Sequence, residues 1–137
     1  MDLLARREHS EQELQRKLLA RGFAPETVGE VLSGLKTAGM QDDARYTEAY
    51  IRNRVAKGFG PVRISRELYE RGITEELVAR VLAAMQMDWE ELVQAVRLKK
   101  FGRQAPADIK EQARQSRFLQ YRGFTYQQIQ RVFTKSY

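Results

Sequence analysis

The side chains best suited to acid–base chemistry are one histidine and two pairs of neighbouring carboxylates. His9 is the only histidine that could activate a serine or threonine, yet it precedes Ser10, a predicted helix N-cap. Asp42-Asp43 and Glu75-Glu76 come at predicted helix starts, where the helix dipole and the free amide groups favour carboxylates. Neighbouring residues on a helix also point about 100° apart. We therefore interpret both pairs as helix caps and expect that the protein is not an enzyme.

The only candidate for a glycine-rich phosphate-binding loop is Gly58-Phe59-Gly60-Pro61. This segment lacks the Lys-Ser/Thr of a P-loop and follows no predicted strand, so we interpret it as a tight connection between two helices. The sequence has no cysteine, which excludes disulfides and thiolate metal ligands and suits a reducing compartment. No cofactor or metal ion is therefore expected. No apolar run approaches the roughly 20 residues that span a bilayer, so we expect a cytoplasmic protein without a membrane partner.

Positive charge is the chemical feature that points to a partner. The formal net charge is +6, and residues 88–137 alone carry ten Lys and Arg against five Asp and Glu. Arginine suits phosphate and carboxylate recognition because its guanidinium group can bond either in pairs. The alternative is a solvated helix surface, but for the two clusters together we favour binding. The candidate contacts are Arg45, Arg52, Arg54, Lys57, Arg63, Arg66 and Arg71 in a first basic cluster and Arg97, Lys99, Lys100, Arg103, Lys110, Arg114, Arg117 and Arg122 in a second basic cluster.

Aromatic residues are interleaved with these charges, and exposed rings beside arginine can stack on the bases of single-stranded DNA. We expect base stacking by few of them, because most large apolar side chains are needed inside the fold. They include Tyr46, Tyr50, Phe59, Tyr69, Phe101 and Tyr121.

Helices have to position these side chains, because apolar residues recur at helical spacing and no alternating strand pattern competes. Capping boxes and prolines mark helix starts, and glycines mark helix ends. The boxes are Ser10/Glu13, Asp88/Glu91 and Thr125/Gln128, the prolines Pro25, Pro61 and Pro106, and the glycines Gly22, Gly39, Gly58, Gly72, Gly102 and Gly123. The pattern predicts helices over residues 2–8, 11–21, 25–37, 42–57, 61–71, 75–86, 89–101, 107–122 and 126–134.

The sequence repeats itself with a period of about 50 residues. Each copy contains Arg-Gly followed by an apolar residue, with a leucine four positions before the glycine and apolar residues six, nine and ten positions after it. The leucines are Leu18, Leu68 and Leu119, and the triplets are Val28/Val31/Leu32, Val78/Val81/Leu82 and Ile129/Val132/Phe133. We predict an all-α protein of tandem three-helix units, stacked into an elongated, curved, right-angled helical array.

The repeat divides the sequence into a first unit over residues 1–39, a second over residues 40–87 and a third over residues 88–137. The first unit lacks most of its first helix, because few residues precede Ser10. No coiled-coil seam is evident, so we expect a monomer.

These motifs resemble the RecX family of bacterial regulatory proteins over nearly the whole sequence. The resemblance depends on their combination, since each piece alone is common. The short first helix departs from the family pattern. The motifs are His9-Ser10-Glu11-Gln12-Glu13-Leu14 with Lys17-Leu18, Asp42-Asp43 with Arg45-Tyr46, Arg52, Arg54, Lys57-Gly58 and Gly60-Pro61, Arg66-Glu67-Leu68 with Gly72-Ile73, Asp88-Trp89, Lys100-Phe101-Gly102, and Phe118-Leu119 with Arg122-Gly123-Phe124 and Ile129.

The resemblance implies a regulator that binds RecA and lies in the groove of the RecA filament on single-stranded DNA. It would block filament extension, inhibit the recombinase, ATPase and co-protease activities, and so modulate DNA repair and the SOS response. It would bind DNA itself more weakly. The residues alone leave a second interpretation open, a sequence-independent DNA-binding helical protein that competes with RecA for the strand. Such binding would weaken steeply with salt.

Overall fold

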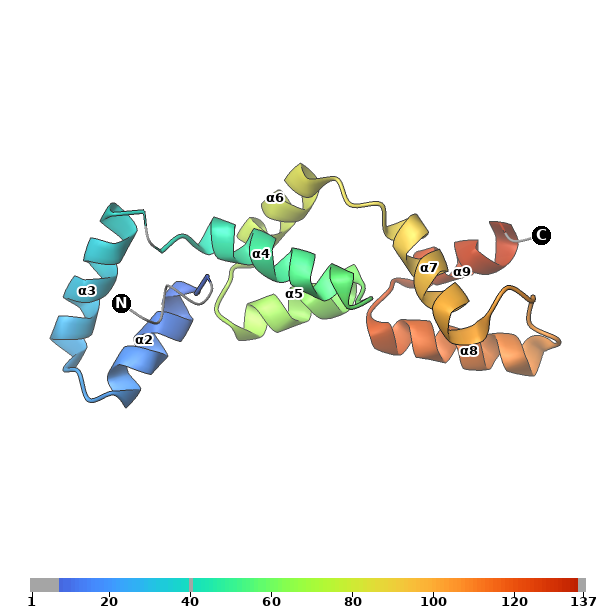
Figure 1. The fold of residues 1–137 in the computed structure, drawn as a ribbon, viewed down its shortest axis with the longest axis horizontal. Coiled ribbons are helices and arrows are strands. Elements are labelled where there is room, and N and C mark those ends of the chain that lie inside the picture. Colours follow the sequence, from blue (N-terminus) through green and yellow to red (C-terminus); the bar gives the residue numbers. More distant parts are fainter. Residues whose placement is uncertain (1–7, 40, 136–137) are drawn as a thin grey trace. The chain divides into compact units, whose positions relative to one another are not determined.

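Helices are the only regular secondary structure in residues 8–39 and 41–135, the part of the chain that the computed structural model describes (Figure 1). They are α2 (Glu11–Ala20), α3 (Pro25–Thr37), α4 (Asp43–Ala56), α5 (Pro61–Glu70), α6 (Glu75–Met85), α7 (Trp89–Phe101), α8 (Ile109–Arg122) and α9 (Tyr126–Lys135). The predicted all-α class is confirmed, and these helices match the predicted ranges to within two residues at each end. Of the predicted helix over residues 2–8, residues 2–7 lie outside the described part of the chain.

The chain divides into two compact units, which we describe separately. Unit 1 consists of residues 1–50 and 67–85, and unit 2 consists of residues 51–66 and 86–137. Helices α4 and α5 each contribute to both units, because the division falls within them. The boundaries after residues 39 and 87 and the elongated array remain predictions. Within residues 8–39 and 41–135, no helix is long and apolar enough to cross a membrane.

The sequence repeat recurs in the backbone geometry of three helix ends. Gly22, Gly72 and Gly123 have φ angles of 93°, 85° and 102°, which glycine adopts without a side-chain penalty. In each case the residue after the glycine donates its N–H to the carbonyl of the leucine four positions before the glycine, at 3.1 or 3.2 Å. This pattern is typical of a Schellman cap, which ends one helix and directs the chain into the next.

Each repeat buries apolar residues that the periodicity selected. In unit 1 the apolar faces of α2 and α3 pack on each other, and in unit 2 α7 packs on both α8 and α9. Removing these side chains from water stabilises helices that would be marginal in isolation. The buried residues include Leu14, Leu18, Val28, Leu32 and Leu35 in the first repeat, Leu68, Val78 and Val81 in the second, and Val93, Leu119, Phe124, Ile129, Val132 and Phe133 in the third.

Helix starts follow the predicted capping boxes. Ser10 and Glu13 form a complete box at α2. Thr125 and Gln128 form the reciprocal pair of hydrogen bonds at α9. At α7, the Asp88 carboxylate accepts a hydrogen bond from the Glu91 N–H at 3.0 Å. Side chains therefore satisfy amide groups that a helix leaves unpaired in its first turn.

Helix α8 begins later than Pro106 suggested. Its N-cap is Asp108, whose carboxylate accepts a hydrogen bond from the Glu111 N–H at 2.8 Å. Pro106 lies in the irregular connection between α7 and α8, whereas Pro25 and Pro61 are the first residues of α3 and α5. A capping carboxylate, not a proline, thus sets the start of α8.

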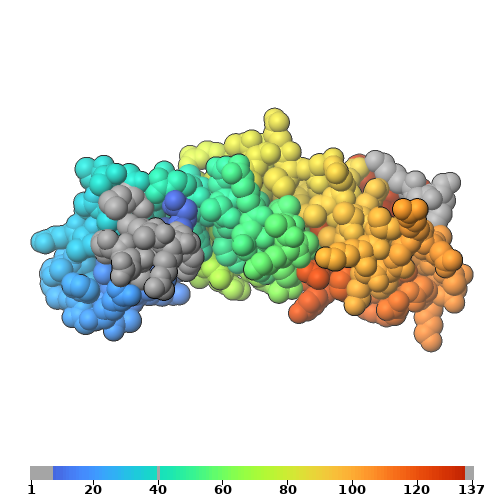
Figure 2. All heavy atoms as spheres, in the orientation of Figure 1, coloured from blue at the N-terminus to red at the C-terminus, as the bar shows by residue number. Residues whose placement is uncertain are grey.

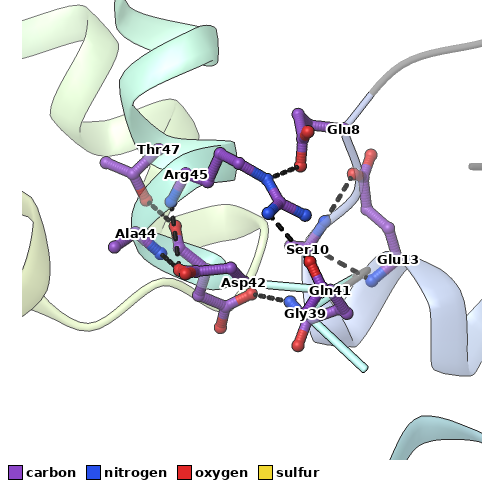
Figure 3. A network of polar contacts seen from close by, with 10 residues as sticks. Glu8, Ser10, Glu13, Gly39, Gln41, Asp42, Ala44, Arg45 and Thr47 are labelled. Carbon is purple, nitrogen blue, oxygen red and sulfur yellow. Dashed lines mark hydrogen bonds and ion pairs between the residues drawn. The ribbon is translucent and has the colours of Figure 1, made fainter. Parts of the chain in front are cut away.

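The two aspartates at the start of α4 act as structural caps in unit 1, and Figure 3 labels the first of them, Asp42. Asp42 Oδ1 accepts hydrogen bonds from the N–H groups of Ala44 and Arg45 at 2.8 and 3.1 Å. Asp43 Oδ1 accepts a hydrogen bond at 2.9 Å from the N–H of Glu11, the first residue of α2. The capping interpretation of this pair is confirmed, and Asp43 also ties the starts of α4 and α2 together.

Candidate polyanion-binding surface

The positive charge of the chain is concentrated in unit 2. Residues 51–66 and 86–137 carry fifteen Lys and Arg against five Asp and Glu, a formal net charge of +10. Residues 1–50 and 67–85 carry nine against thirteen, a formal net charge of −4. The overall charge of +6 therefore combines two units of opposite sign, and long-range attraction to a polyanion acts on unit 2.

Two stretches of unit 2 without a carboxylate side chain come together in the fold. Residues 51–66 hold five Lys and Arg, and residues 112–137 hold another five. Each stretch contributes several of the predicted contact residues, and within each stretch no acidic side chain separates them.

The two stretches meet at a direct backbone contact. The Gly60 N–H donates a hydrogen bond to the Arg122 carbonyl at 2.9 Å, and the Val62 N–H donates one to the Gly123 carbonyl, also at 2.9 Å. Neither glycine has room for a side chain at this contact. The contact therefore fixes the start of α5 against the end of α8.

The ring of Phe59 lies at the centre of the joined clusters. The guanidinium carbons of Arg54, Arg63 and Arg122 lie 4.0, 4.3 and 4.8 Å from its centroid. Cation–π contacts of this kind attract positive charge to an aromatic face. Because Arg54 and Arg63 come from the first basic cluster and Arg122 from the second, the structure unites the two clusters around one ring.

Arg122 also borders a hollow in the surface of unit 2, together with three lysines. Lys57, Lys99, Lys100 and Arg122 line this cationic hollow, and Val96 contributes to its apolar part. None of the lining residues is acidic. In the described part of the chain no ion pair involves any of the three lysines. An anion entering the hollow would meet positive charge without a competing carboxylate.

Further predicted contacts of unit 2 are accessible from solvent. Arg52, Arg66, Arg103, Lys110 and Arg117 all have exposed side chains. Helix α7 and the connection that follows it, drawn in amber and orange, lie on the face of this unit that Figure 2 shows. We call these five residues, together with the cationic hollow and the three arginines at Phe59, the basic surface of unit 2.

Two residues of the first basic cluster belong to unit 1 and are engaged there. Arg45 donates hydrogen bonds from Nε to Glu8 Oε2 and from Nη1 to the Gly39 carbonyl, both at 2.8 Å (Figure 3). The hydrogen bond to Glu8 raises the pKa of Arg45. The guanidinium of Arg71 lies 4.8 Å from the centroid of the Tyr50 ring. Because Arg45 and Arg71 belong to unit 1, we leave them out of the basic surface of unit 2.

Two residues of the second basic cluster bond other residues of unit 2, Arg97 in the interior and Arg114 at the surface. Arg97 is only 6% exposed, and it donates hydrogen bonds to Gln115 Oε1 at 2.9 Å and to the Gln104 carbonyl at 2.8 Å. Arg114 donates paired hydrogen bonds to the Glu111 carboxylate at 2.6 and 2.9 Å. These bonds lower the pKa of Glu111 to about 2 and raise the pKa of Arg114. We assign both arginines to the fold of the unit.

The remaining side chains suited to acid–base chemistry, one histidine and the second carboxylate pair, lie at helix starts. His9 is 2% exposed, and its Nε2 lies 2.9 Å from Lys17 Nζ. Glu75 and Glu76 are exposed in the first turn of α6. The cap of this helix is Thr74, whose Oγ1 accepts a hydrogen bond from the Leu77 N–H at 3.2 Å, so the expectation that the two glutamates are the cap was wrong. Among residues 8–39 and 41–135 there is no group of three or more His, Cys, Asp or Glu that could hold a metal ion.

The sequence interpretation missed one feature of this surface. It treated Gly58-Phe59-Gly60-Pro61 only as a tight connection, whereas the structure shows that this segment also contacts the end of α8. The sequence feature that could have indicated this contact is an aromatic residue between two glycines, inside a basic stretch without carboxylates.

Three RecX family models match successive parts of the sequence. They describe the first, second and third three-helix domains of RecX, and they match residues 1–35, 42–82 and 88–133. The chain belongs to the RecX family. The resemblance identified from the sequence motifs is thereby confirmed.

Curated RecX relatives match along most of their length. The regulatory protein RecX of Halorhodospira halophila is 46% identical over 127 residues, which cover 93% of this chain and 79% of the relative. The regulatory protein RecX of Pseudomonas syringae pv. tomato is 42% identical over 134 residues, which cover 98% of this chain and 86% of the relative. Membership therefore places the protein among RecX regulatory proteins.

Solved RecX structures have the same fold. The crystal structure of RecX from Lactobacillus salivarius superposes with a TM-score of 0.84 at 20% identity, over 98% of this chain and 90% of that one. A second crystal structure, of a regulatory protein RecX, gives 0.80 at 22% identity, over 96% of this chain and 66% of that one. Together with the three domain matches, these structures confirm a RecX fold of three-helix domains.

Proposed function

We propose that this RecX-family protein binds the RecA filament on single-stranded DNA through the basic surface of unit 2. Bound in the filament groove, it limits filament extension and the recombinase, ATPase and co-protease activities of RecA. This role modulates DNA repair and the SOS response, and the protein performs it as a monomer in the cytoplasm. Membership of the RecX family supports the regulatory role, and the charge of unit 2 supports a polyanionic partner.

The observation that carries the proposal is the contact between two basic stretches without carboxylates at Gly60 and Arg122. A filament of protein on DNA presents phosphates, and protein surfaces add carboxylates. Lysine and arginine bind both groups through charge-assisted hydrogen bonds. The cationic hollow, which no acidic residue lines, is therefore suited to such a partner, and the attraction also accelerates encounter.

A charge reversal in the cationic hollow tests the proposal. We expect Lys99→Glu with Lys100→Glu to weaken binding to RecA filaments on poly(dT) by at least about tenfold, because the hollow would then repel the partner. The binding is measured by fluorescence anisotropy of the labelled protein. Unchanged affinity would remove the hollow from the proposed surface.

The matched control carries the same change of charge in unit 1. Arg16 and Arg80 are both exposed, so Arg16→Glu with Arg80→Glu should preserve the fold and keep the affinity within about twofold of the parent. Equal losses for the two double variants would mean that only net charge matters, which contradicts a surface located on unit 2.

The cationic hollow also favours a second candidate function, sequence-independent binding of DNA in competition with RecA. Its four cations and the lack of acidic lining residues suit the phosphates of a naked strand. Affinities for poly(dT) and for the RecA filament, measured in one buffer, separate the two candidates. A comparable affinity for both would favour the DNA competitor, and clearly tighter binding of the filament would favour the regulator of RecA.

A further inference from the structure

Exposed apolar side chains border a second hollow in unit 2, which the basic surface does not explain. Tyr126 is 76% exposed and Val62 is 52% exposed, and both line this hollow. Phe124 and Ile129 also line it but are only 2% and 3% exposed, so Val62 and Tyr126 provide its accessible apolar surface. Contiguous apolar surface on a soluble protein is typical of an interaction site, because a partner can remove it from water. We call this feature the apolar hollow.

Backbone hydrogen bonds hold the walls of the apolar hollow in place. The Val62 N–H bonds to the Gly123 carbonyl at 2.9 Å, which positions the first turn of α5 beside the end of α8. Tyr126 is the first residue of α9, whose start is fixed by the reciprocal bonds of Thr125 and Gln128. The hollow is therefore formed before any partner binds, which limits the entropy lost on binding.

The border of the apolar hollow is positive. Arg117 lines it, and none of the lining residues is acidic. Nearby on the same helix, Tyr121 is 71% exposed and has the Arg63 guanidinium 5.1 Å from its ring centroid. An apolar group flanked by negative charge is the complement of this arrangement.

We infer that the apolar hollow seats one bulky apolar side chain of an acidic protein segment. The side chain packs against the exposed Val62 and Tyr126, and a neighbouring carboxylate pairs with Arg117. Tyr126 contributes a ring of the kind that is enriched among residues dominating protein interfaces. Val62 and Tyr126 favour an apolar side chain over a nucleobase, whose polar edge could bond only the uncharged polar side chains of the lining, Ser116, Gln120, Thr125 and Gln130.

The inference rests on the proposed function, because RecA in the filament is taken as the source of the acidic segment. Two variants test it, Val62→Glu and Tyr126→Ala, and both change exposed side chains. We expect each to weaken binding to RecA filaments on poly(dT) by at least about tenfold, the scale of a dominant interface residue. Affinity for naked poly(dT) should stay within about twofold of the parent for Tyr126→Ala. Circular dichroism and thermal unfolding verify that the variants are folded.

The control for the added charge is Ile109→Glu. Ile109 is 87% exposed in unit 2 and does not line the apolar hollow. Its variant should bind the filament as the parent does, and it should match Val62→Glu in affinity for naked poly(dT). An equal loss in both glutamate variants would attribute the effect to charge and would overturn the inference unless Tyr126→Ala, which changes no charge, also binds the filament more weakly.

Three other results would overturn the inference, and they are distinguishable. A loss for Tyr126→Ala that is as large on naked poly(dT) as on the filament would assign the hollow to a nucleobase. Parent-like binding of both variants, with the parent itself binding the filament, would mean that no segment docks there and would leave the proposed function intact. A parent that does not bind the filament would overturn the proposed function and this inference together.

Discussion

Gly60 lies so close to Gly123 that a Cβ atom on Gly60 would fall 2.6 Å from the carbonyl carbon and oxygen of Gly123. Side chains do not approach a backbone this closely, so the two segments can meet only because neither residue has one. The contact holds the basic stretch around Phe59 against the basic stretch that includes Arg122. It is therefore the structural basis of the basic surface of unit 2.

Gly123→Ala should destabilise the protein by about 2–4 kcal/mol. A Cβ atom there would lie 2.3 Å from Arg63 Cβ, and the φ angle of +102° is unfavourable for alanine. Urea unfolding followed by circular dichroism measures the change. The control is Gly22→Ala at the equivalent position of the first repeat, where φ is +93° but an added Cβ atom would meet no neighbour within 4 Å. It should cost only about 1 kcal/mol, and an equal cost for both variants would contradict the close contact.

The fold could be predicted from the sequence because its signals are local. The repeated glycines and the apolar triplets depend on the spacing of residues within one repeat. The structure has the three glycines at positive φ and buries every triplet residue except Val31 and Leu82, which are half-buried. The contact between Gly60 and Gly123 could not be predicted in this way. It joins segments of different repeats, and nothing in the spacing of either segment specifies its partner.

The candidate contacts were predicted less well than the fold, because sequence does not show which charges a fold uses internally. Arg97 has the same residue type and the same basic neighbourhood as Arg103. The first is buried and bonded to Gln115, whereas the second is exposed. Apolar residues such as Val62 and Tyr126 also escaped attention, because their exposure depends on how α5 and α9 pack.

Arg97→Ala should lower the free energy of unfolding by about 2–4 kcal/mol. The substitution removes a charged donor that is 6% exposed and leaves Oε1 of the buried Gln115 without the hydrogen bond from Arg97 Nε. Urea unfolding measures the loss, with the exposed Arg103→Ala as the control expected within about 0.5 kcal/mol of the parent. Under conditions where both variants are folded, a reduced filament affinity for Arg97→Ala alone would mean that Arg97 belongs to the interface after all.

Glu111 should titrate with a pKa of about 2, well below its ordinary value of 4.5, because Arg114 and then Gln115 donate hydrogen bonds to its carboxylate. A pKa that is lower in the folded state than in the unfolded state stabilises the fold above about pH 4.5. That contribution is lost as the pH falls from 4.5 through 2. NMR titration of the Glu111 carboxyl group measures the pKa, and Arg114→Ala should raise it. The same low pKa in both proteins would contradict the role of Arg114.

Binding of naked poly(dT) should depend on salt through the three lysines of the cationic hollow. Replacing Lys57, Lys99 and Lys100 by alanine should reduce the slope of log K against log salt by about 2, because each phosphate contact on a single strand contributes about 0.7. Fluorescence anisotropy over a range of NaCl concentrations gives the slope. Alanine at the exposed Arg16, Arg21 and Arg80 of unit 1 should leave it unchanged. Equal slopes for the two triple variants would show that the hollow does not bind DNA phosphates.

The single-strand-dependent ATPase of RecA, titrated with this protein, tests the central claim most directly. The affinity for naked DNA is determined in the same buffer, so that the fraction of DNA covered at each concentration is known. We predict strong inhibition when the protein is present at a small fraction of the RecA concentration and most of the DNA is uncovered. Inhibition that begins only when the protein coats the DNA would contradict action on the filament.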